Sequence, residues 1–151
     1  MSSAQSLRIL VVEDEILIAL ELESVLQDAG HTVIEIAASS RAAMECGAKL
    51  KPDLALVDIH LADGPTGVEV ARRLRDIGVT VLFMTANAKR IPEDYAGAQG
   101  VISKPYTERG VREALDYVMS SQRGADAPKL KDSMAFIPFE CRSGGGSSRR
   151  A

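Results

Sequence analysis

The stretch that most constrains the fold of this chain is Lys51–Gly64, KPDLALVDIHLADG, in which an acidic residue directly follows a short apolar run. The run is Leu54–Val57, and its lack of alternation is typical of a strand buried on both faces of a parallel sheet. Asp58 follows at the carboxyl end, the rim at which α/β sheets bind ligands and carry out chemistry. The side chains that surround Asp58 therefore decide what this chain can do.

Four more apolar runs have the length and composition of buried strands, namely Leu7–Val12, His31–Ala37, Val79–Met84 and Val101–Ser103. Strand and helix patterns alternate in five units, which favours a doubly wound α/β fold with helices on both faces of a parallel sheet. The flavodoxin-like order 2-1-3-4-5 suits five units and would bring the ends of the first and third strands together.

Helix signals lie between these runs. Asp14 is well placed to cap a first helix, Ser39 or Ser40 a second, and Thr107 a last helix that runs to about Gln122. A third helix follows the turn-rich stretch HLADGPTG. The fourth connection, ANAKRIPEDYAGAQG, contains a proline and several glycines, which predict a shortened or irregular fourth helix or a loop.

The bulk composition narrows the class of protein. Apolar residues make up 46% of the chain and charged residues 26%, which is ordinary for a globular domain. A net charge of −3 disfavours nucleic-acid binding, which usually needs a basic face. The two cysteines, Cys46 and Cys141, have no metal-ligand spacing, and no stretch resembles a leader or a membrane span. We therefore expect a cytoplasmic protein that does not bind a membrane.

The chain divides near residue 123. Residues 1–123 hold the alternating units and form the predicted domain, whereas residues 124–151 form a C-terminal extension. The extension begins with a linker-like composition and ends in SGGGSSRRA, which predicts disorder. Its apolar segment, 134–139, contains two of the three phenylalanines, so we expect this segment to pack on its own domain or on a second copy.

The predicted strand ends place several charged and polar groups in one crevice. Glu13, Asp14 and Asp58 repel one another there, so the arrangement favours a bound divalent cation, and oxygen ligands favour magnesium. Thr85 ends the fourth strand and Lys104 ends the fifth, so both can converge on Asp58. A magnesium ion, a carboxylate nucleophile, a lysine and a hydroxyl are the components of a phosphoryl-transfer site.

The pattern of these residues, each at a successive strand end, resembles the pattern in the receiver domain of two-component response regulators. The residues that carry the resemblance are Glu13-Asp14, Asp58, Thr85, Lys104-Pro105 and Tyr106. The resemblance covers roughly Leu7 to Gln122 and implies the strand order given above. It implies that Asp58 is the phosphoacceptor and takes a phosphoryl group from a histidine kinase or a histidine phosphotransfer protein. The protein would then be a phosphoprotein that assists its own phosphorylation and dephosphorylation. It would not be an enzyme in the usual sense.

The resemblance also implies a ligand set. Asp14 and Asp58 would hold Mg²⁺ through their carboxylates, Glu13 directly or through water, and His60 through its backbone carbonyl. Lys104 would pair with the phosphoryl group and would be held by a cis bond to the following proline.

A switch is implied as well. Thr85 would swing its hydroxyl toward the phosphoryl oxygens, and Tyr106 would turn inward into the vacated space. The chain departs from the usual family pattern in its short fourth connection, in which it is similar to a subclass of single-domain receivers that have a loop there. We expect a mobile segment near Asn87–Ala98 that reorganises on phosphorylation.

Three interpretations of the function of the whole chain compete. The first is a stand-alone receiver that signals by protein contact, since we expect no output domain after Gln122. Such a receiver would be a monomer or a weak homodimer. The second is a small magnesium-dependent phosphatase with Asp58 as nucleophile, although His60 stands where such enzymes usually have a second acid. The third is a receiver-like scaffold that is never phosphorylated. The apolar Ile16, Leu17 and Leu20 could dock a histidine-bearing helix or belong to the ordinary core.

Overall fold

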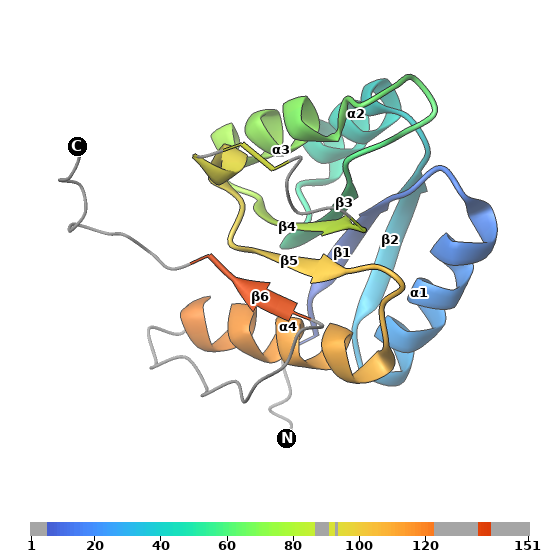
Figure 1. Ribbon diagram of the computed structural model, residues 1–151, viewed down its shortest axis with the longest axis vertical. Coiled ribbons are helices and arrows are strands. Elements are labelled where there is room, and N and C mark those ends of the chain that lie inside the picture. Colours follow the sequence, from blue (N-terminus) through green and yellow to red (C-terminus); the bar gives the residue numbers. More distant parts are fainter. Residues whose placement is uncertain (1–5, 87–90, 93, 123–135, 140–151) are drawn as a thin grey trace, which may run out of the picture.

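One mixed β-sheet runs through the middle of the molecule (Figure 1). The structure is a computed structural model that describes residues 6–86, 91–92, 94–122 and 136–139. The strands are β1 (Arg8–Val12), β2 (Thr32–Ala37), β3 (Leu54–Asp58), β4 (Thr80–Thr85), β5 (Gly100–Ser103) and β6 (Phe136–Pro138). Their spatial order is β2-β1-β3-β4-β5-β6, and the neighbours among the first five are parallel. The predicted order 2-1-3-4-5 is confirmed.

Two pairs of helices cover the two faces of the sheet (Figure 1). The helices α2 (Ser40–Leu50) and α3 (Gly67–Asp76) pack on one face. The helices α1 (Ile16–Asp28) and α4 (Glu108–Gln122) pack on the other. The doubly wound α/β architecture is therefore confirmed. Within the described residues, no helix combines the length and the apolar character needed to cross a bilayer.

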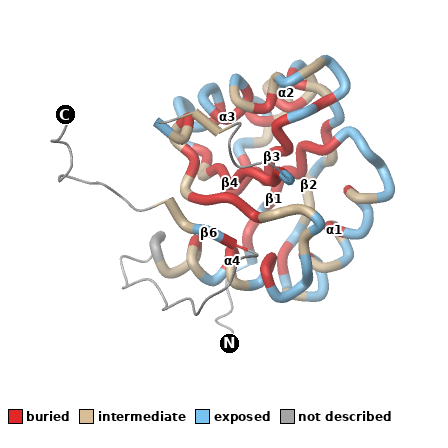
Figure 2. Tube along the Cα trace, viewed as in Figure 1, coloured by how far each residue is buried: buried red, intermediate tan, exposed pale blue. Residues whose placement is uncertain are grey.

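The central strands are buried on both faces, as their apolar runs predict (Figure 2). Successive side chains of a strand point to opposite faces of the sheet. In β3, Leu54 and Leu56 face the core under α1 and α4, whereas Ala55 and Val57 face the core under α2 and α3. All four have no exposed surface. The run before Asp58 is therefore apolar because it contributes to two cores at once.

The helix caps agree with the sequence in two of three places. Ser39 and Thr107 each accept a hydrogen bond on the side-chain oxygen from the amide three residues further on, at the starts of α2 and α4. The predicted cap at Asp14 is wrong, because Glu15 occupies the N-cap position of α1 and makes no side-chain cap hydrogen bond. The carboxylate of Asp14 lies instead among other acidic groups at the sheet rim.

The connection between β4 and β5 differs from the other connections. In the part that the structure describes, it contains one turn of 3₁₀ helix, η2 (Tyr95–Gly97), where the other parallel connections contain α-helices. This agrees with the predicted irregular fourth helix and with the proline and glycines of the segment. Residues 87–90 and 93 lie outside the described residues, so the mobility expected for Asn87–Ala98 stays a prediction.

Within the described residues the sheet has six strands, so the expectation of five parallel strands needs correction. The added strand is β6, which pairs antiparallel with the free edge of β5. Its Phe136 is only 1% exposed and joins the core under α1 and α4. Burial of this ring stabilises an otherwise very short strand. Of the predicted apolar segment 134–139, the described part therefore packs on its own domain, and residues 134–135 lie outside the described residues.

Candidate functional site

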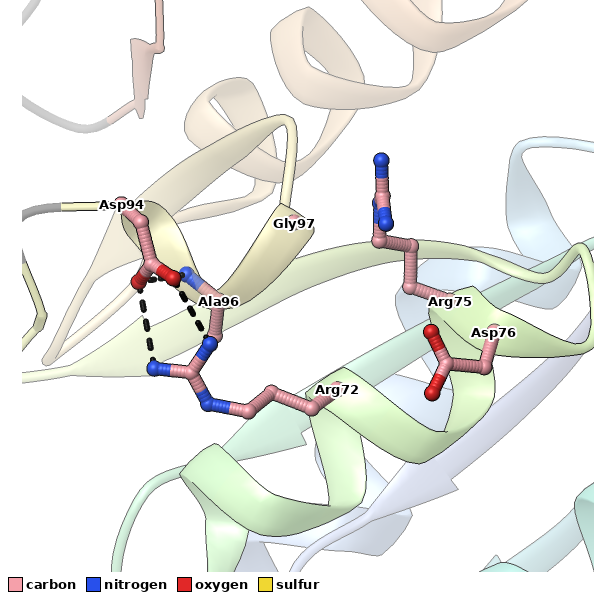
Figure 3. A pocket seen from close by; sticks show the side chains of 6 residues that line it. All are labelled: Arg72, Arg75, Asp76, Asp94, Ala96 and Gly97. Carbon is pink, nitrogen blue, oxygen red and sulfur yellow. Dashed lines mark hydrogen bonds and ion pairs between the residues drawn. The ribbon is translucent and has the colours of Figure 1, made fainter.

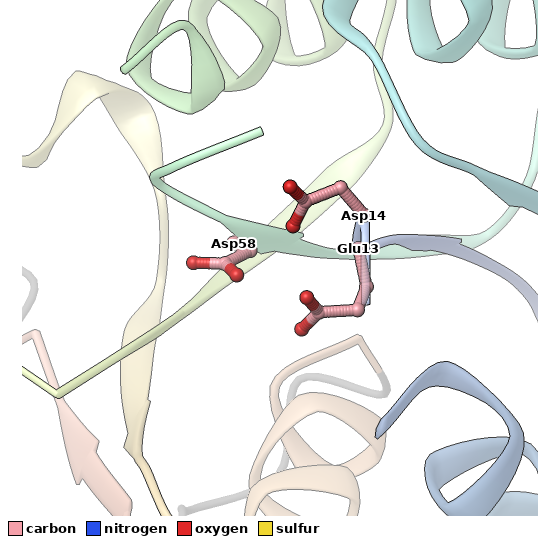
Figure 4. Close-up of side chains that lie close together, drawn as sticks. All are labelled: Glu13, Asp14 and Asp58. Atoms are coloured by element: carbon pink, nitrogen blue, oxygen red, sulfur yellow. The ribbon is translucent and has the colours of Figure 1, made fainter. Parts of the chain in front are cut away.

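Acidic side chains from two neighbouring strands meet at the carboxyl rim of the sheet (Figure 4). Asp58 ends β3, and Glu13 and Asp14 directly follow β1, which pairs in parallel with β3. Carboxylate oxygens of these three residues lie within 4.8 Å of one another. Glu13 and Asp58 are buried, at 1% and 8% exposed, whereas Asp14 is exposed. We call these three residues the acidic cluster.

Lys104 binds two members of the acidic cluster from the end of β5. Its Nζ donates a hydrogen bond of 2.9 Å to Oε1 of Glu13 and one of 2.8 Å to Oδ2 of Asp58. The Lys104 backbone amide also donates to the carbonyl of Thr85 at 3.0 Å, which ties the ends of β4 and β5 together. The Lys104-Pro105 peptide bond is cis. The sequence expectation that Lys104 converges on Asp58 therefore agrees with this geometry.

Burial and neighbouring charges shift the pKa values of Glu13 and Lys104 in opposite directions. Burial raises the pKa of Glu13 above its usual value, while the hydrogen bonds from Lys104 and from the Glu15 amide act in the opposite direction. Burial alone would lower the pKa of Lys104, but its hydrogen bonds to Asp58 and Glu13 outweigh that effect and raise it. The ammonium group therefore stays charged and compensates part of the negative charge around it.

The acidic cluster fits a divalent cation. In the described part of the chain, Lys104 pairs with two of the three carboxylates, so the cluster keeps an excess of negative charge after this lysine is counted. All donors are oxygen atoms, which suit hard cations such as magnesium better than zinc. The exposed Asp14 leaves one side open to water, which magnesium usually retains. These three residues could therefore hold a metal ion.

The other predicted site residues lie around the same rim. Thr85 is the last residue of β4, is 7% exposed and follows Met84, which pairs with Asp58 across the strands. The backbone amide of His60 donates a 3.3 Å hydrogen bond to Oδ1 of Asp58. Tyr106 is half-buried, and its hydroxyl donates a 2.7 Å hydrogen bond to the carbonyl of Ile18 in α1.

One residue that positions the site is missed by the sequence reasoning. Gly67, at the start of α3, passes so close to β3 that a Cβ atom there would overlap the carbonyl oxygen of Asp58. Its amide donates a 2.9 Å hydrogen bond to the carbonyl of Ile59. Only glycine allows this approach. In the sequence, Gly67 ends the turn-rich DGPTG, where a glycine is explained by the turn alone.

A cleft opens beside Lys104, and the helix that lines it also carries exposed apolar side chains. The cleft has a volume of about 430 Å³ and lies between α1 and the stretch Lys104–Tyr106. On α1, Ile16, Leu17 and Leu20 are 58%, 77% and 47% exposed. Their alternative assignment to the ordinary core is therefore wrong, because they lie on the surface.

Comparison with known proteins identifies the family. A family model described as "Response regulator receiver domain" matches residues 9–116. The chain therefore belongs to the response regulator receiver domain family of two-component signalling. The fold agrees with that of a solved relative, the receiver domain of the Erythrobacter litoralis PhyR response regulator. That likeness has a TM-score of 0.72 at 31% identity and covers 86% of this chain and 100% of the other.

Similar full-length proteins are regulators. The phyllosphere-induced regulator PhyR of Methylorubrum extorquens is 33% identical over 120 residues, covering 78% of this chain and 45% of that protein. The transcriptional regulatory protein PhoP of Escherichia coli K12 is 31% identical over 123 residues, covering 78% and 54%. A structure described as the anti-anti-sigma factor PhyR of Bartonella quintana has a TM-score of 0.71 at 26% identity, covering 81% and 51%. The chain thus spans about half the length of these relatives.

Proposed function

We propose that this protein is a response regulator that accepts a phosphoryl group on Asp58 and signals by contact with other proteins. The observation that carries the proposal is the convergence of Lys104, Glu13 and Asp14 on Asp58 in a member of the receiver family. The donor would be a phosphohistidine on a sensor histidine kinase or on a histidine phosphotransfer protein.

The proposed transfer exchanges one bond for another. A carboxylate oxygen of Asp58 forms a bond to phosphorus, the bond between phosphorus and the histidine nitrogen breaks, and the imidazole keeps the electron pair. Lys104, now bound to Oδ2 of Asp58, would shift its ammonium to the incoming phosphoryl oxygens and offset their charge. The transfer needs no other nucleophile, and Asp58 would act as acceptor without turning over a substrate.

A bound Mg²⁺ would be held by Glu13, Asp14 and Asp58, with the backbone carbonyl of His60 as a further oxygen. It would supply positive charge to the phosphoryl group in transfer and in hydrolysis. The excess negative charge of the acidic cluster supports this assignment. Removal of magnesium by a chelator should therefore abolish labelling of Asp58.

Phosphorylation would act on a switch formed by Thr85 and Tyr106. The Thr85 hydroxyl would move to a phosphoryl oxygen, which offers a charge-assisted hydrogen bond. Tyr106 would give up its hydrogen bond to Ile18 and turn inward. This change would alter the surface beside α1 and β5 from which the signal is transmitted.

The partner that delivers the phosphoryl group would dock on α1. Ile16, Leu17 and Leu20 are exposed apolar side chains of α1, the helix that also lines the cleft at Lys104–Tyr106. A histidine-bearing helix could cover these side chains and place its imidazole near Asp58.

The proposal is tested by incubation of the protein with magnesium and a small phosphodonor, such as acetyl phosphate, followed by intact-mass measurement. We expect one added phosphoryl group in the wild-type protein and none in Asp58→Asn. A matched control is Asp76→Asn, which removes an exposed carboxylate at the end of α3, away from the rim. Asp76→Asn should label as the wild type does.

Other outcomes would favour the competing functions. Steady release of inorganic phosphate, without a labelled protein that can be observed, would favour a phosphatase. Absence of labelling from a folded wild-type protein, with small donors and with a panel of histidine kinases, would favour a scaffold. Normal labelling of Asp58→Asn would contradict the assignment of the acceptor.

A further inference from the structure

The edge of β5 carries a docked C-terminal strand, β6, on a surface that fits it closely (Figure 1). The Phe136 ring is 1% exposed and lies against Tyr117 of α4, with ring centroids 5.6 Å apart. A Cβ atom at Gly100 of β5 would lie 2.6 Å from this ring and 2.9 Å from the carbonyl oxygen of Ile137. Any larger residue at Gly100 would therefore push β6 away from the sheet.

Phe139, which directly follows β6, contacts the turn between β4 and β5. The rings of Tyr95 and Phe139 stack at a centroid distance of 4.1 Å and an interplanar angle of 13°. The Phe139 amide donates a 2.9 Å hydrogen bond to the carbonyl of Gln99, just before β5. Residues 136–139 thus bind the edge of β5 and η2 together.

The turn at η2 depends on outside contacts. Its three residues have φ angles of 58°, 49° and 82°, a region that residues with side chains seldom adopt. From α3, Arg72 donates hydrogen bonds of 2.7 and 3.1 Å to Asp94, which in turn accepts one from the Ala96 amide (Figure 3). From the other side, Phe139 covers Tyr95. Loss of the Phe139 contact would remove one of these two supports of the turn.

The contacts of β6 also lie between two residues of the phosphoacceptor site. Thr85 precedes η2 along the chain, and Lys104 follows β5. The stretch between them leads into Lys104, which binds Asp58, and it pairs with β6 through β5. A change at either place can therefore bias the other, and the coupling must be reciprocal.

We propose that residues 136–139 of the same chain are a displaceable strand whose docking on β5 and Tyr95 sets the turn at η2 and is coupled to phosphorylation of Asp58. The strand is suited to release because it has three residues, lies at a sheet edge and contains Pro138, which has no amide donor. Phosphorylation would change the fraction of molecules in which β6 is docked. The coupling to Asp58 rests on the proposed function, whereas the docking and its effect on η2 do not.

The first test measures hydrogen exchange in the unphosphorylated full-length chain, and its reporter is the Ala98 amide, which donates to the carbonyl of Tyr95 at 2.8 Å. Phe139→Ala removes the stacked ring, and we expect Ala98 to exchange roughly threefold to tenfold faster, as the loss of an aromatic pair implies. Ile137→Ala is the matched control, because its side chain is 40% exposed on the same strand. Equal exchange rates in the two variants would overturn the proposal.

A second variant guards against general destabilisation by Phe139→Ala. Tyr95→Asn removes the ring from the other side, and asparagine tolerates the left-handed backbone at this position. We expect the Phe139 amide to exchange faster in Tyr95→Asn, while amides in β1 and β3 keep their wild-type rates. Faster exchange throughout the sheet in both variants would contradict a local docking equilibrium.

The source of the docked strand is tested by dilution. If β6 comes from the same chain, Phe139 protection is independent of protein concentration and the protein sediments as a monomer. Protection that falls on dilution, together with a dimer, would overturn the assignment to the same chain and indicate strand exchange with a second copy.

The coupling is tested with beryllofluoride and magnesium, which mimic a phosphoryl group on the acceptor. Binding at Asp58 is followed by fluorine NMR, and protection of the Phe139 amide is measured in the same sample. We expect the protection of Phe139 to change by about fivefold or more when the analogue binds. Binding without any change would overturn the coupling. Absence of binding would contradict the proposed function and the link to Asp58, while the exchange test of β6 would still stand.

Discussion

The half of the sheet around β1 and β3 and the half around β5 and β6 are stabilised in different ways. In the first half, β1 and β3 each lie between two other parallel strands, and Ile9–Val12 and Leu54–Val57 have no exposed surface. In the second half, the strands have four and three residues, and the described part of the β4–β5 connection holds a single 3₁₀ turn. In the second half, contacts between side chains that are far apart in the sequence hold the strands in place, and long apolar runs in the sequence do not. We therefore expect the first half to be the stable frame and the second half to be the part that responds to phosphorylation.

The largest loss of folding stability is expected from Leu56→Ala, in the middle of β3. Leu56 has no exposed surface and packs in the core under α1 and α4. The substitution should lower the free energy of unfolding by about 2–5 kcal/mol, through lost burial and a residual cavity. Urea denaturation measures the change, and Leu20→Ala on the exposed face of α1 is the control. Equal, small losses for both would contradict the view that this half is the frame.

Phe136→Ala should have an intermediate effect although its side chain is larger. The ring is buried, but if β6 leaves the sheet without unfolding the other strands, as we propose, the loss is limited to the free energy of docking β6. We therefore expect a smaller decrease in the unfolding free energy than for Leu56→Ala, measured in the same urea series. A larger decrease would mean that β6 and the rest of the sheet unfold as one unit.

A smaller effect, visible only on acidification, is expected at His31, beside the start of β2. Its Nδ1 accepts a 3.0 Å hydrogen bond from the Leu7 amide, and burial lowers the pKa of this histidine below its usual 6.5. The unfolded chain therefore takes up the proton first as the pH falls. The contribution of His31 to stability is complete above pH 6.5 and is lost as the pH falls toward the folded-state pKa.

The measurement for His31 compares urea midpoints of the wild type and His31→Asn on both sides of pH 6.5. We expect the wild type to lose stability below this pH more steeply than the variant, because asparagine keeps an acceptor and has no proton to bind. Parallel pH profiles of the two proteins would show that His31 does not carry the dependence.

The smallest effect on overall stability is expected from Arg72→Ala, in the responsive half. The Arg72 and Asp94 side chains are 44% and 62% exposed, and exposed ion pairs contribute little because water and salt screen them. The hydrogen bond from Arg72 lowers the pKa of Asp94, which shows the direction of the interaction. We expect almost no change in the urea midpoint, in low or high salt. A loss comparable to that of Phe136→Ala would show that η2 is part of the frame.

Much of the fold could be predicted because the frame is encoded in contiguous residues. The apolar run that ends at Asp58 corresponds to β3, and runs of similar type correspond to β1 and β4. The strand β6 could not be predicted in this way, since three residues with a proline carry no periodic signal. Its position depends on the absence of a side chain at Gly100, far earlier in the chain.

The site was predictable to the extent that parallel strands bring their carboxyl ends to one rim. This rule places Asp58, Glu13 and Lys104 near one another, and their contacts agree with it. It could not predict that Lys104 binds two carboxylates at once. Nor could it predict that Glu15, and not Asp14, occupies the N-cap position of α1. Those details depend on side-chain geometry. The roles in phosphoryl transfer remain proposals.

The direction of β6 has a practical consequence. Because β6 runs antiparallel to β5, Pro138 pairs with Gly100 at the amino end of β5, whereas Asp58 lies at the opposite rim. A fluorescent label joined to the chain just after Phe139 would therefore be attached on the far side of the sheet from the acidic cluster. Such a label could report the departure of β6 without obstructing a kinase that approaches Asp58.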